Sequence, residues 1–274
     1  MLPENVQWYF PSTLREASKL IQKEGIILHA GGTRILKTQT KSIKGLVEIS
    51  GLGLNYIKNN KNKISIGAGS TFADVVAYNR ATKQLPMLAK ALHQAASTPL
   101  RNRITIGGSL KDFPLWSSLY APLLALNAKV KVTGEAVGIY SIEDYVTKNI
   151  IKKNHIVKEI IIKEEPGLIA DIKRFSLIKF EYPLFTIAAA FKVKNFIVQN
   201  ARFYITGVKS RFKRFKRAES IFINKQITSE LIENSIKFIN PKFPSDYKYS
   251  SDYKETVSKV NFNDLLTELR KKVV

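Results

Sequence analysis

Two Gly-Gly pairs, each placed directly after a run of apolar residues, constrain the folding of this chain more than any other feature. The first pair, Gly31-Gly32, follows IILHA at residues 26–30, and the second, Gly107-Gly108, follows Ile104-Thr105-Ile106. We expect each run to form a strand that ends at its glycines. Adjacent glycines let the backbone adopt positive φ and approach other groups closely. The sequence therefore predicts two tight turns at strand ends.

Both predicted turns offer the same chemistry. Each exposes backbone N–H groups and is followed by a hydroxyl residue, Thr33 or Ser109. An anion can accept hydrogen bonds from several such N–H groups, so two facing turns would hold a diphosphate between them. Neither pair fits the Walker pattern G-x-x-x-x-G-K-[ST] or the Rossmann pattern G-x-G-x-x-G. For each pair taken singly, the alternative is a turn at which a strand and a helix pack closely.

The rest of the chain mixes helical and strand patterns, which predicts an α+β fold. Thr71 and Pro86 are typical helix-starting residues. Helices are expected at 12–25, 71–84, 86–97, 117–128, 141–149, 227–240 and 261–272. Strands are expected at 26–30, 45–50, 129–132, 157–163, 172–180, 186–193 and 195–208, with a hairpin at 56–69.

A Pro-Gly turn in EEPGLIAD suggests a boundary near residue 165. We expect two α/β subdomains, at 1–55 and 56–165. A C-terminal α+β domain at 170–274 is expected to combine an antiparallel sheet with helices.

The chain has no cysteine, which excludes disulfides and Cys-ligated zinc or iron–sulfur centres on this polypeptide. Its three histidines, His29, His93 and His155, show no metal-ligand spacing. The sequence therefore predicts no metal site, and any electron carrier must be organic or belong to another chain.

The formal net charge is +22, which attracts nucleic acid, anionic ligands or an acidic partner protein. A Lys-rich genome or a hot habitat is the alternative explanation. The densest basic run is KSRFKRFKR at residues 209–217. Its interleaved phenylalanines are compatible with an RNA-binding patch, but a strand-to-helix connection with a solvated basic face is the favoured interpretation. We predict no nucleic-acid partner.

The apolar runs, such as APLLALNAKV, are broken before they reach the length of a membrane span. The first residues, MLPENVQWYF, lack the charged-then-apolar pattern of a secretory signal. We expect a soluble, cytoplasmic protein.

The order of several motifs resembles the FAD-binding medium subunit of the molybdenum hydroxylases, the family of xanthine, carbon monoxide and aldehyde dehydrogenases. AGGT at residues 30–33 and LVEIS at 46–50 match two of them. IGAGST at 66–71 and LPMLAKALHQAASTPLRNRITIGGSL at 85–110 match two more, of which the last is the most specific. EYPLFTIAAAF at 181–191 also matches, and the resemblance covers nearly the whole chain.

The resemblance implies the two-subdomain FAD-binding fold of the vanillyl-alcohol-oxidase and MurB type, followed by a C-terminal α+β domain. It implies an oxidoreductase subunit that passes electrons through flavin from iron–sulfur clusters to an acceptor. The expected partners are a large molybdopterin-binding subunit and a small [2Fe-2S] subunit, in a hetero-oligomer such as a dimer of heterotrimers. The FAD-binding residues carried over from the resemblance are Leu28, His29, Ala30, Gly31, Gly32, Thr33, Arg34, Ile35, Thr105, Ile106, Gly107, Gly108, Ser109, Ser118 and Lys179.

Four of these positions depart from the family pattern or carry more than one interpretation. Arg34 stands where the family often has Asp, and either pairs with phosphate or faces solvent. Ser109 replaces Asn, and Ser118 replaces Asp. Lys179 either stabilises reduced flavin or is a solvated surface lysine. These departures support an alternative function, a flavin-poor or flavin-free structural subunit of such a complex.

Two aromatic side chains near these motifs also have alternative roles. Tyr182 either stacks on the flavin ring or fills the core between domains, and the core is favoured. His29 either touches the ligand or is simply packed and hydrogen-bonded within its strand.

Overall fold

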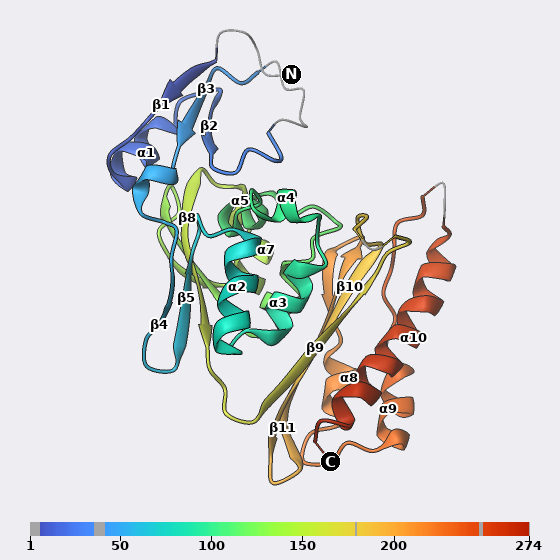
Figure 1. Ribbon diagram of the computed structural model, residues 1–274. Helices are drawn as coiled ribbons and strands as arrows, with labels where there is room; N and C mark the ends of the chain where they lie inside the picture. Colours follow the sequence, from blue (N-terminus) through green and yellow to red (C-terminus); the bar gives the residue numbers. More distant parts are fainter. Residues whose placement is uncertain (1–5, 36–41, 179, 247–248, 274) are drawn as a thin grey trace. The chain divides into compact units, whose positions relative to one another are not determined.

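The computed structural model describes residues 6–35, 42–178, 180–246 and 249–273 (Figure 1). Its internal contacts divide the chain into two compact units, and each unit is assembled from separate stretches of sequence. The first unit contains Met1–Lys83, Ala96–Asp112 and Asn127–Lys163. The second contains Gln84–Ala95, Phe113–Leu126 and Glu164–Val274. The division expected from sequence, at 1–55, 56–165 and 170–274, stays a prediction.

A small parallel sheet opens the first unit. Its strands are β1 (Gln7–Tyr9), β2 (Ile26–His29) and β3 (Gly45–Glu48), in the order β1-β3-β2. Helix α1 (Leu14–Leu20) connects β1 to β2, and the hydroxyl of Thr13 caps it by accepting a hydrogen bond from the N–H of Glu16. Strand β2 lies at the edge of this sheet, and the first glycine pair follows its carboxyl end.

A second sheet in the same unit is antiparallel. Its strand order is β4-β5-β8-β6-β7, so the strand that is last in sequence lies in the middle. These strands are β4 (Ile57–Asn59), β5 (Lys63–Gly67), β6 (Lys129–Gly134), β7 (Gly138–Ser141) and β8 (His155–Lys163). The expected hairpin at 56–69 is present as β4 and β5.

Short helices complete the first unit. Thr71 begins α2 through a capping box, in which its hydroxyl and the Asp74 carboxylate each accept the other residue's backbone N–H. These elements are η1 (Ser50–Leu52), α2 (Phe72–Thr82), α4 (Thr98–Arg101), α5 (Ile106–Asp112), α7 (Ile142–Thr147) and η2 (Ile150–Lys152).

The second unit is built on an antiparallel sheet with the order β12-β11-β10-β9. Its strands are β9 (Leu168–Phe175), β10 (Phe185–Lys194), β11 (Ile197–Val208) and β12 (Arg211–Arg214). Its helices are α3 (Pro86–His93), α6 (Tyr120–Ala125), α8 (Lys216–Ser220), α9 (Ser229–Ile236) and α10 (Ser251–Arg270). The expected antiparallel meander followed by helices is therefore confirmed in this unit.

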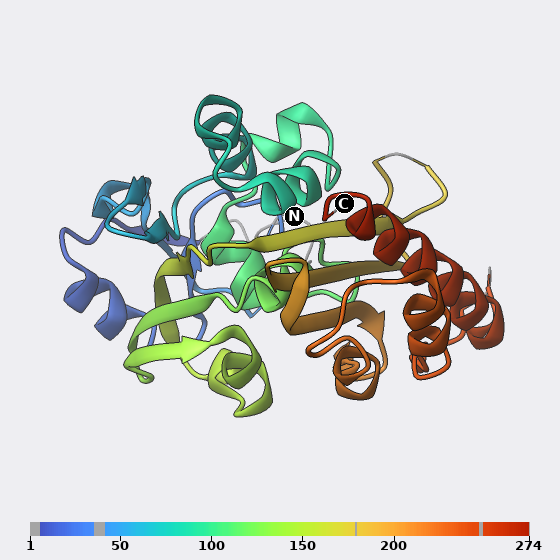
Figure 2. The ribbon, with the colours of Figure 1, turned by 90° about the horizontal axis from the view of Figure 1, so that it is seen from below.

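The two faces of this sheet differ because side chains alternate along β10. Phe185, Ile187 and Phe191 belong to a buried cluster that includes side chains of α8, α9 and α10. In Figure 2 these orange and red helices run beside the strands. Ala188 and Ala190, which alternate with that set, are also buried, and α6 packs on β10 and β11. We assign the alanines to the α6 face, where small side chains permit close approach.

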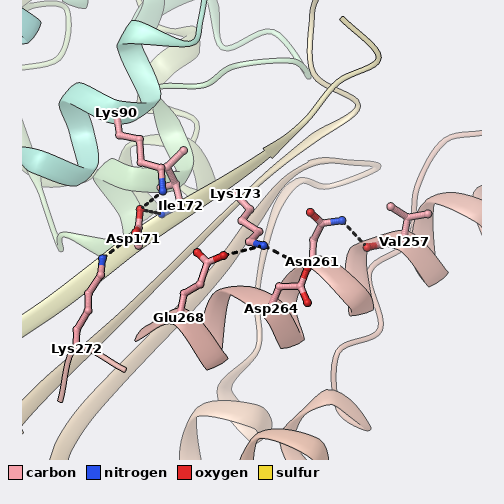
Figure 3. Close-up of polar contacts among 9 residues, drawn as sticks. All are labelled: Lys90, Asp171, Ile172, Lys173, Val257, Asn261, Asp264, Glu268 and Lys272. Carbon is pink, nitrogen blue, oxygen red and sulfur yellow. Dashed lines mark hydrogen bonds and ion pairs between the residues drawn. The ribbon is translucent and has the colours of Figure 1, made fainter. Parts of the chain in front are cut away.

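A charged cluster on β9 joins three elements of the second unit (Figure 3). The carboxylate of Asp171 pairs with Lys90 of α3 at 2.6 Å and with Lys272, just beyond α10, at 2.8 Å. Lys173 pairs with Asp264 and Glu268 of α10, at 3.2 and 3.1 Å. Burial alone raises the pKa of Asp171, but hydrogen bonds from both lysines and from its neighbour's N–H outweigh burial and hold the pKa below its usual range. The cluster ties α3 and α10 to the same strand.

One expectation about secondary structure is wrong. Residues 104–106 do not form a strand, since Thr105 makes only an isolated bridge with Thr71. The chain instead enters α5 at Ile106, which places Gly107 and Gly108 in the first turn of a helix. The N–H groups of Ile106 and Gly107 donate to the carbonyls of Ser70 and Ala68, and these bonds end the extended conformation earlier than the β-branched residues suggest.

Candidate functional site

The first glycine pair forms a non-helical loop at the carboxyl end of β2. Gly32 has φ of 70°, the left-handed conformation expected for this turn, and is buried. In the described part of the chain, no hydrogen bond is donated by the backbone N–H of Gly31, Gly32 or Thr33. Buried amides rarely lack partners. This loop therefore has the donors that an anionic group requires.

His29 packs beneath this loop. Its Nδ1 lies 2.5 Å from Oε2 of Glu48 on β3, and its ring meets the Trp8 ring edge-on at 4.9 Å. A Cβ built on Gly32 would lie 2.8 Å from Nε2 of His29, so the imidazole occupies the space of a side chain at position 32. Of the two roles proposed for His29, this geometry supports the packed and hydrogen-bonded one.

Glu48 holds the base of the same loop. Besides His29, its carboxylate accepts a hydrogen bond from the N–H of Ser50 at 2.8 Å. Burial raises the pKa of Glu48, but the hydrogen bonds from Ser50 and His29 outweigh it, so this pKa lies below its ordinary value. The pairing fixes the His29 ring against the loop.

The second glycine pair has a different environment. The N–H of Gly107 donates to Ala68 at 2.8 Å, so that amide is already used within the protein. The N–H of Gly108 makes only a 3.3 Å bond to the Thr105 hydroxyl, and Gly108 is exposed. The hydroxyl of Ser109 is half-buried and makes no hydrogen bond with the described residues. The ligand-facing groups here are therefore Gly108 and Ser109, and not Gly107.

The structure brings the two glycine motifs together. A Cβ built on Gly31 would lie 1.6 Å from the carbonyl oxygen of Arg103 and 3.6 Å from Cγ2 of Thr105. The Arg103 guanidinium donates to the carbonyl of Gly31 at 3.2 and 3.3 Å. Arg34 forms an ion pair with Asp112, the last residue of α5, at 3.2 Å. The motifs are thus joined at both ends.

Helix α5 is also anchored on its other side. Nζ of Lys111 donates to the carbonyls of Ile151, at 2.7 Å, and Lys153, and lies 3.4 Å from Nδ1 of His155. Nε2 of His155 is 2.8 Å from the hydroxyl of Tyr145. Burial lowers the pKa of Lys111 to about 8, and burial together with the Lys111 charge lowers the pKa of His155 to about 4. His155 is the first residue of β8.

The remaining predicted residues belong to the second unit or fall outside the described residues. Ser118 is buried ahead of α6 in the second unit, whereas Leu28–Ile35 and Thr105–Ser109 belong to the first. Lys179 lies outside the described residues. Tyr182 is half-exposed and its ring contacts that of Trp116 at 4.7 Å, within the second unit, while its expected position between domains stays a prediction.

The basic run at residues 209–217 forms β12 and the start of α8, as its strand-to-helix interpretation predicts. Arg211 donates to the carbonyl of Phe113, Lys213 binds Asn240, and Arg214 pairs with Glu219. Arg217 lies over the ring of Phe238. These contacts within the second unit give the run a structural role.

Three residues that matter to the site were missed by sequence reasoning. Arg103 stands inside the recognised RNRITIGG block, and this position was a usable signal. Glu48 and Ala68 act through distant partners, His29 and Gly107, and periodicity does not encode such pairings.

Within residues 6–35, 42–178, 180–246 and 249–273, no group of three or more His, Asp or Glu side chains is placed to hold a metal ion. None of the helices in these ranges combines the length and the apolar character needed to cross a membrane.

Comparison with protein families gives one match over more than half of the chain. The family model described as "FAD binding domain in molybdopterin dehydrogenase" matches residues 4–163. This range includes both glycine motifs, Glu48, Arg103 and Asp112.

Similar proteins cover nearly the whole chain. The glyceraldehyde dehydrogenase medium chain of Sulfolobus acidocaldarius is 25% identical, over 95% of this chain and 96% of its own length. The nicotinate dehydrogenase FAD-subunit of Eubacterium barkeri is 24% identical, over 97% and 98%. Among solved structures, quinoline 2-oxidoreductase from Pseudomonas putida 86 superposes with a TM-score of 0.89 at 19% identity, covering 100% of this chain and 99% of that one.

Proposed function

The chain belongs to the family of FAD-binding domains of molybdopterin dehydrogenases, and from this membership we propose that it holds FAD as the electron-transferring medium subunit of a molybdenum hydroxylase. Membership confirms the resemblance seen in the sequence, and the solved structures confirm the predicted fold class. The relatives are dehydrogenase subunits, which agrees with an oxidoreductase.

The observation that carries this proposal is the first glycine loop. The N–H groups of Gly31, Gly32 and Thr33 have no partner in the described chain, so these residues fit a diphosphate that accepts from them. Gly108 and Ser109 lie at the neighbouring end of α5 and offer further donors. We assign the diphosphate to these five residues.

The other expected contacts have weaker support. Leu28, Ala30 and Ile35 flank the loop, and Thr105, Ile106 and Gly107 position α5 through internal hydrogen bonds. Ser118 and Lys179 stay predictions. When bound, the flavin would accept and release electrons, and the role of this chain is to bind and orient it.

The partners follow from the same proposal. We expect a large molybdopterin-binding subunit and a small iron–sulfur subunit, in a hetero-oligomer such as a dimer of heterotrimers. The support is the family description and the words "medium chain" and "FAD-subunit" in the names of the relatives. Because this chain has no cysteine, iron–sulfur clusters ligated by Cys would belong to another polypeptide. The cytoplasmic location expected from the sequence also stays a prediction.

A second function, a flavin-poor structural subunit, is favoured by one specific observation. Ile106 and Gly107 donate their amides to Ser70 and Ala68, so the second motif offers fewer donors than its composition suggests. If the first loop alone cannot hold the cofactor, the protein would organise the complex without flavin.

Titration of the purified full-length protein with FAD separates these functions. We expect FAD to bind, with quenching of flavin fluorescence, and ADP to compete because it carries the same diphosphate. FMN has only one phosphate and cannot fill a diphosphate site. We therefore expect FMN to compete at least tenfold more weakly than ADP, a difference of about 1.4 kcal/mol in binding free energy. A protein that takes up no FAD would support the structural subunit, and equal binding of FMN would contradict the diphosphate assignment.

A further inference from the structure

Arg34 and Asp112 connect the ends of the two glycine motifs. Arg34 follows Thr33, the last of the three residues whose amides find no partner among the described residues, and Asp112 closes α5. Nε of Arg34 lies 3.2 Å from Oδ2 of Asp112. The Arg34 side chain is half-exposed and the Asp112 side chain is 29% exposed.

Neither residue is explained by its own local structure. A carboxylate at a helix C-terminus faces the negative end of the helix dipole, so Asp112 is unfavourable within α5 alone. An exposed ion pair contributes little to folding stability, typically below about 1 kcal/mol. The contact does, however, join two segments that are more than seventy residues apart in the sequence.

The location of the pair relative to the amides gives it a role. A free carboxylate close to a diphosphate would repel it, because like charges disfavour each other at short range. Arg34 neutralises this carboxylate and at the same time fixes the loop against α5. The Arg103 guanidinium, on the carbonyl of Gly31, holds the opposite end of the loop.

We propose that Arg34 and Asp112 form a positioning pair that sets the spacing between the two glycine motifs and keeps the carboxylate from repelling the diphosphate of FAD. This inference rests on the proposed function. It replaces both earlier interpretations of Arg34, as a phosphate partner and as a solvent-facing charge.

Charge reversal tests the pair. The full-length protein is prepared as wild type, Arg34→Asp, Asp112→Arg and the double variant, and FAD affinity is measured by quenching of flavin fluorescence. We expect each single reversal to weaken FAD binding by roughly tenfold and the double reversal to return it to within about threefold of wild type, as coupled residues do in a double-mutant cycle.

A matched control is the ion pair between Lys148 and Asp144 in α7, which is also exposed and lies at 3.0 Å. Reversing it is expected to leave FAD affinity unchanged. Thermal unfolding of each apoprotein shows whether folding is affected, and the neutral variants Arg34→Gln and Asp112→Asn replace any reversal that fails to fold.

The outcomes are distinct. If Arg34→Asp weakens binding while Asp112→Arg strengthens it or leaves it unchanged, Arg34 binds phosphate directly and the positioning pair is wrong. Unchanged affinity in both single variants overturns it as well. If wild type binds no FAD, the proposed function fails and the inference fails with it, whereas failure of the inference alone leaves wild-type binding intact.

Discussion

The two glycine motifs have almost the same composition but different structures. In the first, Gly31-Gly32 forms an irregular loop, and its amides have no partner among the described residues. In the second, Gly107-Gly108 starts a helix, and the Gly107 amide is used by Ala68. The difference teaches that a glycine pair marks close approach, while the state of its amides decides whether the approaching group is a ligand or the protein itself.

The space around the glycines does not follow the division between the two motifs. Cβ atoms built on Gly31 and Gly107 would meet the protein's own atoms, the Arg103 carbonyl at 1.6 Å and the Ala68 side chain at 2.7 Å. A Cβ on Gly108 would meet only the Thr105 hydroxyl. A side chain at Gly31 or Gly107 would therefore clash with the protein, whereas a side chain at Gly108 would meet only one flexible hydroxyl.

The largest expected effect is that of Gly31→Ala. Its Cβ overlaps a backbone carbonyl that cannot move without shifting the 103–105 segment, so the two motifs must separate. We expect a loss of about 3 kcal/mol in the free energy of unfolding, at the upper end for overpacking, together with loss of FAD binding. Urea denaturation and flavin titration measure the two effects.

The control for this variant is Gly51→Ala, because nothing lies within 4 Å of a Cβ at Gly51. We expect its stability to change by less than about 0.5 kcal/mol, as for most surface substitutions. Equal stability of the two variants would show that the first loop does not pack against Arg103.

A smaller effect concerns the anchoring of the second motif and depends on pH. The pKa of His155 falls from 6.5 to about 4 in the folded protein because burial disfavours its charge. As the pH falls, His155 therefore becomes protonated in the unfolded chain before it does so in the folded protein. The free energy of unfolding then decreases between about pH 6.5 and about pH 4, by at most about 3 kcal/mol. His155→Gln, which cannot titrate, is expected to flatten this part of the profile.

Urea denaturation at several pH values measures that slope. His93→Gln, at an exposed histidine of α3, is the matched control and is expected to keep the wild-type slope. If His155→Gln also keeps it, the buried histidine is not the group that makes the anchor of α5 acid-sensitive.

The smallest expected change separates folding from binding within one motif. Gly107→Ala presses on Ala68 and should cost about 2 kcal/mol of stability. Gly108→Ala gains helix propensity, but its Cβ would lie 2.9 Å from the Thr105 hydroxyl and displace it, so its stability should stay within about 1 kcal/mol of wild type. Because Gly108 faces the proposed diphosphate, we expect its variant to bind FAD roughly tenfold more weakly, a change worth about 1.4 kcal/mol. A Gly108→Ala protein with unchanged affinity would exclude the second motif from the site.

Sequence reasoning predicted much of the fold because most elements carry local signals. The Thr71 cap, the Pro86 start of α3 and the Asn-rich hairpin of β4 and β5 are all present. The meander of β9–β11 also follows its hydrophobic pattern. In these elements propensity and tertiary packing agree.

The errors arose where distant segments decide local structure. Ile104-Thr105-Ile106 has strand propensity, but the carbonyls of Ala68 and Ser70 take its following amides and start α5. The Arg34–Asp112 and His29–Glu48 pairs depend on the same kind of long-range contact. Residues whose partners are far away in sequence leave no periodic signal. The sequence therefore identified the two glycine pairs but not the contacts that the residues around them make.

The alanine face of β10 has a consequence for how this polypeptide can be made. Helices α3 and α6, which pack on the four-stranded sheet, come from residues synthesised before any of its strands. During translation the residues of both helices are therefore made before the C-terminal strands emerge, and the strands supply the surface on which those short segments pack. A fragment expressed from Glu164 onward would expose Ala188 and Ala190 to water, so cutting the gene at that point would not release an independent folding module.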